Sequence, residues 1–229
     1  MQIKKDINSD IFRQYDIRGI YEQDLDQDVA YTIGLAFGSY IKNIGQNKTV
    51  IGYDNRLSSP ILHKGLCQGI LDTGIDITNI GLVTTPIYYF SWQHLNMESG
   101  IMITASHNPK EYNGFKISYN GKYNAYGDMV KLLKNIIDND QISYGQGSIK
   151  DINIYNEYIN FVTSSIKLGD KKLKVVIDCG NGSASLIAKE VFEKLNIDYI
   201  PIFCDSDGNF PNHHPDPSVE KNLTFLKEE

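Results

Sequence analysis

Short apolar segments alternate with amphipathic helical segments through the first half of the chain. Val29, Ile33, Phe37 and Ile41 recur every four residues within 26–44, so they share one face of a predicted helix. The remaining segments of this pattern are predicted strands at 49–51, 75–80 and 100–104, and predicted helices at 59–74 and 86–94. Strands and helices that alternate in this way predict an α/β fold built of layers.

A strong turn signal interrupts the alternation near the middle of the chain. Asn120 and Gly121 stand between the segment 115–117 and residues 122–123, which is the pattern of a type I′ β-hairpin. A hairpin adds an antiparallel strand to the sheet. We therefore predict a sheet of mixed strand directions.

A polar stretch with two glycines indicates where one domain ends. It covers residues 139–150 and follows a predicted helix at 128–138. Loops of this composition connect domains more often than they lie inside one. We predict a first domain over residues 1–148 and a second over residues 149–229.

The second domain contains one predicted βαβ unit. A connecting helix is predicted at 151–167, and strands at 173–178 and 199–203 flank a turn and a helix that ends at Leu195. A further helix is predicted from Ser218, which leaves a sheet of only two strands. Two parallel strands leave apolar faces and strand edges uncovered, and natural domains avoid this. We therefore expect the chain to be a truncated part of a longer protein.

Charge and cysteine content narrow the classes of function. The chain has 229 residues, a net charge of -6 and a pI near 5.4, so long-range attraction to nucleic acid or to an anionic membrane is disfavoured. Cys67, Cys179 and Cys204 are widely spaced, and the amino-terminal residues lack the apolar core of a signal peptide. We expect a cytoplasmic globular protein with no nucleic-acid or membrane partner, whose cysteines are small core residues.

One serine occupies a position suited to a nucleophile. Ser106 lies in the loop directly after the predicted strand at 100–104, and ligands of open α/β sheets bind beyond the carboxyl ends of strands. Thr104, His107 and Asn108 add a hydroxyl, an imidazole and an amide group around it, a combination that suits phosphate. The same residue types are also typical of an ordinary turn, in which serine and asparagine bond to their own backbone.

The stretch 100–116 reads Gly-Ile-Met-Ile-Thr-Ala-Ser-His-Asn-Pro-Lys-Glu-Tyr-Asn-Gly-Phe-Lys. It closely resembles the phosphoserine loop of the α-D-phosphohexomutases, the phosphomannomutase/phosphoglucomutase family. Further segments resemble the same family in order along the chain, at 12–19, 52–60, 84–86 and 207–217. The resemblance implies a three-layer, mixed-sheet α/β domain that carries the phosphoserine, followed by an incomplete second α/β domain.

The resemblance also implies roles for four side chains. Ser106 carries the phosphoryl group, Lys116 acts as general acid and base, and Arg18 orients the phosphate. His107 either donates to a phosphate oxygen or bonds to the loop backbone.

The basic residues have interpretations without catalysis as well. Lys116 is also consistent with a solvent-facing lysine on a hairpin, and Arg18 with a surface ion pair to Asp16. Arg56 lies on a loop after a strand, and we interpret it as structural support.

The implied reaction moves phosphate between the C1 and C6 hydroxyls of one hexose phosphate, of mannose or glucose. It passes through a hexose 1,6-bisphosphate, which is also the activator. Tyr15 and Asn108 resemble residues that line the substrate cleft. Mg²⁺ is the implied cofactor, bound by the phosphate on Ser106 and by an aspartate-rich loop expected shortly after residue 229. The chain alone is therefore expected to be inactive, and its oligomeric state is left open.

Other functions and other metals find less support in the sequence. A phosphoglucosamine mutase and a non-catalytic sugar-phosphate-binding module remain alternatives, whereas the Gly-x-Ser-x-Gly elbow of serine hydrolases is missing around Ser106. The run 205–210 begins like a calcium loop but has Phe210 where that loop needs glycine. His213 and His214 are adjacent, and adjacent side chains usually point apart rather than toward one zinc ion. Residues 180–182 match only part of a dinucleotide-binding loop, so we interpret them as a tight turn.

Overall fold

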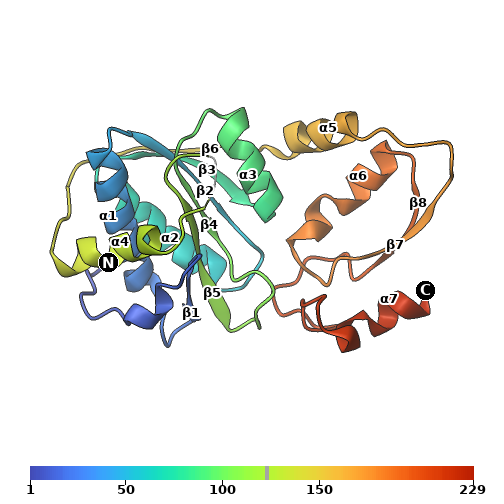
Figure 1. Cartoon of the computed structure of the whole chain (residues 1–229), viewed down its shortest axis with the longest axis horizontal. Helices are drawn as coiled ribbons and strands as arrows, with labels where there is room; N and C mark the ends of the chain where they lie inside the picture. The colour runs from blue at the N-terminus through green and yellow to red at the C-terminus, as the bar shows by residue number, and fades with distance from the viewer. Residues whose placement is uncertain (122–123) are drawn as a thin grey trace.

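Six strands form the main sheet within the described residues, 1–121 and 124–229, of this computed structural model (Figure 1). Their order across the sheet is β1 (Ile17–Ile20), β5 (Tyr112–Ser118), β4 (Gly100–Ile103), β2 (Lys48–Tyr53), β3 (Asp76–Leu82) and β6 (Ile149–Asp151). β5 pairs antiparallel with β1 and β4, whereas β2 pairs in parallel with β3 and β4, and β3 with β6. The predicted mixed sheet is confirmed.

Helices cover both faces of this sheet because side chains alternate between the faces along each strand. Ile51 and Ile101 belong to one hydrophobic core, whereas their neighbours Val50 and Met102 belong to a second one. The first core includes side chains of α1 (Gln27–Asn43), α2 (Ser59–Leu71) and α4 (Asp128–Asp138), and the second includes those of α3 (Thr85–His94). The implied three-layer domain is therefore present, with a helix layer on either side of the sheet (Figure 1).

α1 and α2 pack at close range where two glycines face the neighbouring backbone. A Cβ atom on Gly34 would lie 2.3 Å from the carbonyl oxygen of Leu66, and one on Gly69 would lie 2.1 Å from that of Tyr31. Only glycine fits at these two positions. Across the described part of the chain, no helix combines the length and the apolar character needed to cross a membrane.

The predicted hairpin at Asn120 and Gly121 extends beyond the described residues, because it includes residues 122 and 123. β5, which precedes it, pairs with β1 on one side and β4 on the other. β4 is connected to β5 by residues 104–111, which contain Ser106 and form the serine loop.

Strand β6 lies at the edge of the main sheet and favours a domain boundary later than residue 148. Residues 149–151, which the predicted boundary assigns to the second domain, pair with β3 of the main sheet. The polar stretch before them also packs on the first domain, because the N–H of Gly145 donates to the Asp72 carbonyl at 2.8 Å. We therefore propose a boundary between β6 and α5 (Tyr155–Ser165).

One βαβ unit follows α5, as predicted. β7 (Lys174–Asp178) and β8 (Asp198–Ile202) pair in parallel. Their connection contains a 3₁₀ turn at Ser183–Leu186 and helix α6 (Ala188–Lys194).

The last helix begins later than the prediction from Ser218. The N–H and Oγ of Ser218 both donate to Oδ1 of Asp216, at 2.9 and 2.6 Å, which forms a turn instead of a helix start. Helical structure begins with a 3₁₀ turn at Glu220–Leu223 and continues as α7 (Thr224–Glu228).

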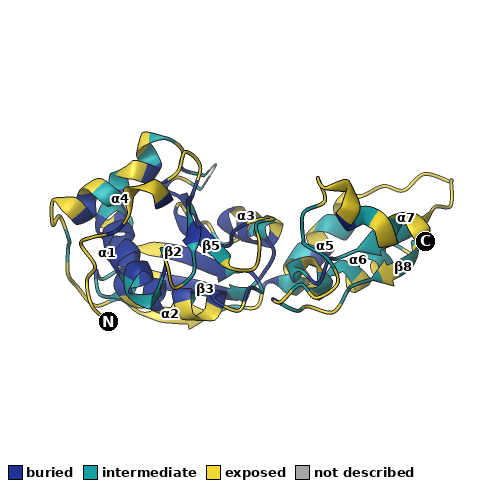
Figure 2. Ribbon diagram, turned by 90° about the horizontal axis from the view of Figure 1, so that it is seen from below, coloured by how far each residue is buried: buried dark blue, intermediate teal, exposed yellow. Residues whose placement is uncertain are grey.

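The second sheet is much less buried than the first. Every residue of β7 and β8 is at least partly exposed, whereas Ile51 and Ile101 in the main sheet are fully buried. Leu173, directly before β7, and Phe225 of α7 are 56% and 49% exposed. Figure 2 shows the same contrast, with buried residues concentrated around β2 and the helices of the first domain. The second unit therefore has less apolar burial to oppose local unfolding.

We predict that this contrast is measurable by native-state hydrogen exchange. Amide hydrogens of 175–178 in β7 should exchange at least about 100-fold faster than those of 50–53 in β2, because local opening needs less free energy where fewer apolar contacts are lost. Nuclear magnetic resonance of the same sample compares both strands under identical conditions. Equal protection of the two strands would contradict the prediction.

One buried side chain at the end of β2 holds the loop between β4 and β5. The side chain of Arg56 is 1% exposed, and its Nε donates to Oδ2 of Asp54 at 3.2 Å. Its two terminal nitrogens donate to four backbone carbonyls, those of Ser106 (3.0 Å), Asn108 (2.7 Å) and Pro109 (2.7 Å) in the loop and that of Tyr112 (3.1 Å) at the start of β5. All five N–H groups of the guanidinium therefore have acceptors. The interpretation of Arg56 as structural support agrees with these contacts.

We predict that Arg56→Met lowers the free energy of unfolding by about 3–5 kcal/mol, because it leaves the Asp54 carboxylate buried without its cation. Arg56→Lys keeps the charge but has three donors in place of five, so its loss should lie between wild type and Arg56→Met. Urea denaturation measures all three proteins. Arg13→Met, at an exposed arginine, is the matched control and should change stability by less than about 0.5 kcal/mol. An Arg56→Met loss as small as that of the control would contradict the role of Arg56.

Candidate active site

Ser106 is presented to solvent by a loop whose backbone is held on both sides. The N–H of Ser106 donates to Oγ1 of Thr104 at 3.0 Å, and its carbonyl accepts the bond from Arg56. The residue has a φ of 57°, in the left-handed region that only a few non-glycine residues occupy. Strained conformations of this kind cluster at functional sites. The exposed Oγ of Ser106 lies 3.3 Å from Nδ1 of His107, and it is the one group of this residue that remains available to a ligand.

The register of the sheet brings two cations to the same face near this loop. Arg18 on β1 lies opposite Gly114 of β5, and Lys116 lies two residues farther along β5, opposite Met102 of β4. Residues two apart in a strand point to the same face. The neighbouring Phe115 points to the other face, into the core formed with α1 and α2. Lys116 and Arg18 therefore share the face opposite that core, beside the end of β4.

Arg18 connects this face to the serine loop. It donates to Oδ1 of Asn108 at 2.7 Å through Nη1 and forms an ion pair with Asp16 through Nη2. The sequence suggests a surface ion pair between Arg18 and Asp16 as the alternative to a catalytic role. The pair forms, but it is largely buried, with side-chain exposures of 14% for Arg18 and 7% for Asp16. The Arg18 Nε is buried and has no hydrogen-bond partner within the described residues. Arg18 therefore forms the ion pair with Asp16 and also contacts the loop that contains Ser106.

Lys116 is not the solvent-facing lysine of the alternative interpretation. It is half-buried in an interior strand, and this burial lowers its pKa from the usual value. The carboxylate of Asp16 acts in the opposite direction, and the guanidinium of Arg18 lowers the pKa further. A lysine with a lowered pKa is a better proton acceptor near neutral pH, because more of it is in the neutral form.

Of the remaining predicted site residues, Asn108 contacts Arg18 and His107 contacts Ser106. Asn108 is held between Arg18, which bonds to its side chain, and Arg56, which bonds to its carbonyl. His107 is exposed and contacts the hydroxyl of Ser106. Tyr15 is 63% exposed in the turn before β1, so its ring is accessible to a bound molecule.

A polar network beneath the loop was not predicted from the sequence. Oδ1 of Asp54 accepts from the hydroxyl of Ser59 at 2.7 Å, and the fully buried Asn113 donates through Nδ2 to the hydroxyls of Ser58 and Ser59 at 2.8 and 3.0 Å. These bonds hold the carboxylate that pairs with Arg56. Asp54 and Asn113 both fall inside segments that resemble the family, but the residue types alone do not reveal that they join.

The second unit contacts the chain directly beside Arg56. Nδ2 of Asn55 donates to the carbonyl of Asn181 at 2.7 Å and to Oγ of Ser206 at 3.0 Å. A Cβ atom on Gly208 would lie 2.3 Å from the Asn55 carbonyl oxygen, so this approach needs glycine. The segment 207–217, which also resembles the family, therefore lies against the residues that hold the serine loop.

The groups around Ser106 suit an anion. Arg18 and Lys116 are basic residues, and a ring nitrogen of His107 contacts the hydroxyl of Ser106. Within residues 1–121 and 124–229, no cluster of three histidine, cysteine, aspartate or glutamate side chains is arranged to hold a metal ion. These residues therefore fit phosphate and do not by themselves fit Mg²⁺, which needs oxygen ligands on several sides.

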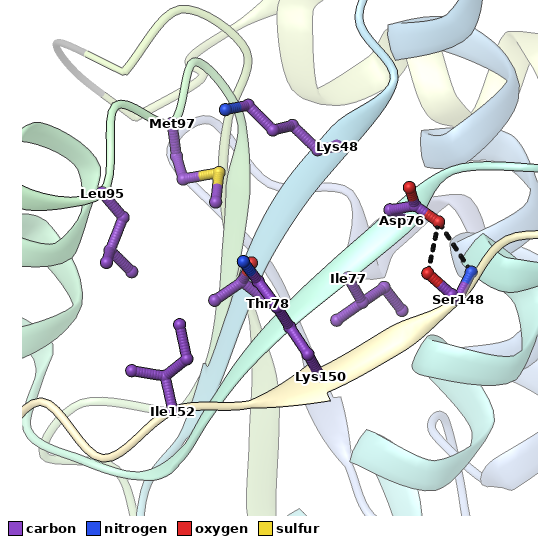
Figure 3. A pocket seen from close by; sticks show the side chains of 9 residues that line it. All are labelled: Lys48, Asp76, Ile77, Thr78, Leu95, Met97, Ser148, Lys150 and Ile152. Atoms are coloured by element: carbon purple, nitrogen blue, oxygen red, sulfur yellow. Dashed lines mark hydrogen bonds between the residues drawn. The ribbon is translucent and has the colours of Figure 1, made fainter.

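A cavity elsewhere in the first domain lacks comparable chemistry. It lies at the amino ends of β2 and β3, the opposite end of the sheet from Ser106, and Lys48, Asp76 and Lys150 contribute to its lining (Figure 3). The Asp76 carboxylate accepts two bonds from Ser148, both at 2.7 Å, and these bonds lower its pKa.

Two models of one protein family match the chain. The model for phosphoglucomutase/phosphomannomutase, alpha/beta/alpha domain I, matches residues 9–143. The model for alpha/beta/alpha domain II of the same proteins matches residues 156–228. Both matches together span most of the chain.

Similar proteins carry names that agree with these models. The phosphomannomutase/phosphoglucomutase of Pseudomonas putida is 43% identical over 216 residues, which are 94% of this chain and 46% of that protein. The phosphoglucomutase of Neisseria meningitidis is 41% identical over 222 residues, which are 96% of this chain and 48% of that protein. The chain thus spans about half the length of the curated relatives it matches.

A known crystal structure has the same fold over almost the whole chain. It is that of a phosphoglucomutase/phosphomannomutase family protein from Burkholderia thailandensis, with a TM-score of 0.89 and 38% sequence identity. The similarity covers 98% of this chain and 50% of that one. This structure and the two family models together show that the chain belongs to the phosphoglucomutase/phosphomannomutase family.

Proposed function

We propose that this chain is the phosphoserine-bearing part of a phosphohexomutase, with Ser106 as the carrier of the phosphoryl group. The reaction would move phosphate between the C1 and C6 hydroxyls of a hexose phosphate through a hexose 1,6-bisphosphate. The relatives named phosphomannomutase and phosphoglucomutase support mannose and glucose phosphates as the substrate class. Because the chain spans about half the length of those relatives, the activity of a complete enzyme is part of the proposal.

The observation that carries this proposal is the exposed hydroxyl of Ser106 on a fixed loop beside two cations. A phosphoserine has a charge of about -1.5 to -2 near neutral pH, so it needs cations close by. Lys116 and Arg18 lie on the face of the sheet next to the loop, and Asn108 ties Arg18 to it. Preorganised charge of this kind is the main way in which proteins stabilise phosphoryl transfer.

We assign the proton transfers to Lys116. When the phosphoryl group moves from the sugar to Oγ of Ser106, the neutral amine of Lys116 accepts the proton of the Ser106 hydroxyl, and the departing sugar oxygen takes up a proton from water. When the group leaves Ser106, the ammonium of Lys116 returns the proton to Oγ, and the accepting sugar hydroxyl releases its proton to water. We assign Arg18 to orienting the phosphate, and Tyr15 and His107 to contacts with the sugar phosphate.

Magnesium enters the proposal only through family membership. The phosphate on Ser106 would be its one ligand from the serine loop, and the described residues do not gather the carboxylates that the ion requires. Phosphoglucosamine as substrate, and a binding module without catalysis, are the alternatives. A binding module predicts that Ser106 stays unmodified.

We predict that, in a complete enzyme that contains this chain, Ser106 acquires one phosphoryl group, either in the cell or from added glucose 1,6-bisphosphate. Ser106→Ala should lose this modification completely, because it removes the oxygen that we propose as the phosphoryl acceptor. Intact-mass spectrometry measures the added mass, and peptide mapping locates it. Ser164→Ala, at an exposed serine of α5, is the control and should be modified like wild type. Consistent absence of phosphate from wild type would favour the binding module.

We predict that Lys116→Met slows phosphorylation of Ser106 by glucose 1,6-bisphosphate by about 10²–10⁴-fold, the usual contribution of a general base. Lys116→Arg should be similarly slow, because arginine keeps a charge but does not deprotonate. Quenched-flow mass spectrometry gives the rates. Lys131→Met, at an exposed lysine of α4, should leave the rate unchanged.

The pH dependence gives an additional test of Lys116. The proton-accepting form is the neutral amine, so the wild-type rate should rise with pH and level off at the lowered pKa of Lys116. An unburied lysine would level off only near its usual pKa of 10.5. A rate that levels off there, or an active Lys116→Arg protein, would contradict the assignment.

A further inference from the structure

Two cysteines that the proposed reaction does not use lie side by side in the second unit. Cys179 directly follows β7, and Cys204 lies two residues after β8. Their Sγ atoms are 3.0 Å apart, and both are free thiols. The third cysteine, Cys67, is buried in α2, where its nearest polar contact is His63 at 3.3 Å.

The two thiols lie close enough for a disulfide to form. The register of β7 and β8 ends with Asp178 opposite Ile202, and one further residue along each strand places Cys179 opposite Phe203, directly before Cys204. The pairing of β7 with β8 continues to Cys179, because its N–H donates to the Ile202 carbonyl at 3.2 Å. An S–S bond is about 2.0 Å long, so the sulfur atoms need to approach by about 1 Å. Side-chain rotation can supply much of that movement.

We infer that Cys179 and Cys204 form a reversible disulfide in the presence of a small-molecule disulfide such as oxidised glutathione. One cysteine thiolate attacks a sulfur of the oxidant and releases one glutathione thiolate, which leaves a mixed disulfide on the protein. The second cysteine thiolate attacks the protein sulfur of that mixed disulfide and releases the other glutathione. Two cysteine thiols are oxidised, one glutathione disulfide is reduced to two thiols, and the protons of the cysteines pass to the released glutathione.

The bond would join the two segments through which the second unit contacts the first domain. Cys179 lies two residues before Asn181, and Cys204 lies two residues before Ser206. Asn55 donates to the carbonyl of Asn181 and to the hydroxyl of Ser206. Oxidation would therefore covalently join the two segments that contact Asn55, the residue next to Arg56. The inference does not depend on phosphoryl transfer by Ser106.

The surroundings of Cys179 determine how the test is run. Burial raises the pKa of Cys179 to about 12, with a further contribution from the neighbouring Cys204 thiol. A thiol with a raised pKa reacts slowly near neutral pH, since only the thiolate attacks a disulfide. The extent of oxidation at equilibrium is therefore the informative measurement, rather than its rate.

The experiment equilibrates the 229-residue chain with oxidised glutathione and then alkylates it under denaturing conditions. The number of alkylated thiols should fall from three to one, and dithiothreitol should restore all three. The mass before alkylation should fall by two hydrogen atoms. Trypsin should release the peptides 175–189 and 195–221 as one linked species, because each contains one of the two cysteines.

Two variants make the result specific. Cys67→Ser should still form the linked peptides, whereas Cys204→Ser should not. Three alkylated thiols in the oxidised wild type would overturn the inference. A link that includes Cys67, a link between two chains, or a glutathione adduct that persists on one cysteine would overturn it as well. The peptide map of wild type decides the question even if Cys204→Ser does not fold.

Discussion

The buried guanidinium of Arg56 determines where the serine loop lies. Regular strand pairing ends with β4, and four hydrogen bonds from Arg56 to backbone carbonyls hold the chain beyond it. The fifth donor of Arg56 bonds to the Asp54 carboxylate, which also balances the charge of the guanidinium. A charge in this position is stable only because every donor has an acceptor, since an unpaired buried charge costs several kcal/mol. The same saturation leaves Arg56 no donor for a ligand. It bonds to the backbone of Ser106, while the cations that we propose to contact a ligand come from β1 and β5.

The position of Arg56 also links the two units of the chain. The ring of Phe210 lies 5.5 Å from the guanidinium carbon, and Gly208 packs against the backbone of Asn55. A shift of the second unit would therefore act on the residues that hold the loop. Cys179 and Cys204 each lie two residues before a residue that contacts Asn55. Through these contacts, the geometry around Ser106 depends on side chains of both units, although the serine belongs to the first domain alone.

Local patterns predicted the elements of this fold better than the contacts between them. The four-residue spacing in 26–44 and the apolar run at 100–104 are local signals, and both elements form. The bonds from Arg56 to Pro109 and Tyr112 join residues about fifty positions apart and exist only because β4 lies beside β2 in the sheet. β6 was missed because its three residues are all exposed and carry no apolar period. The burial of Lys116 likewise depends on strand order, since β5 lies between β1 and β4.

The most direct test of the site is a crystal structure of the chain with phosphate attached to Ser106. We expect phosphate oxygens within hydrogen-bond distance of the Lys116 amine and the Arg18 guanidinium, with the four bonds from Arg56 to backbone carbonyls unchanged. Phosphate on another residue, or a phosphoserine whose oxygens point to solvent away from both cations, would contradict the proposed role of this loop.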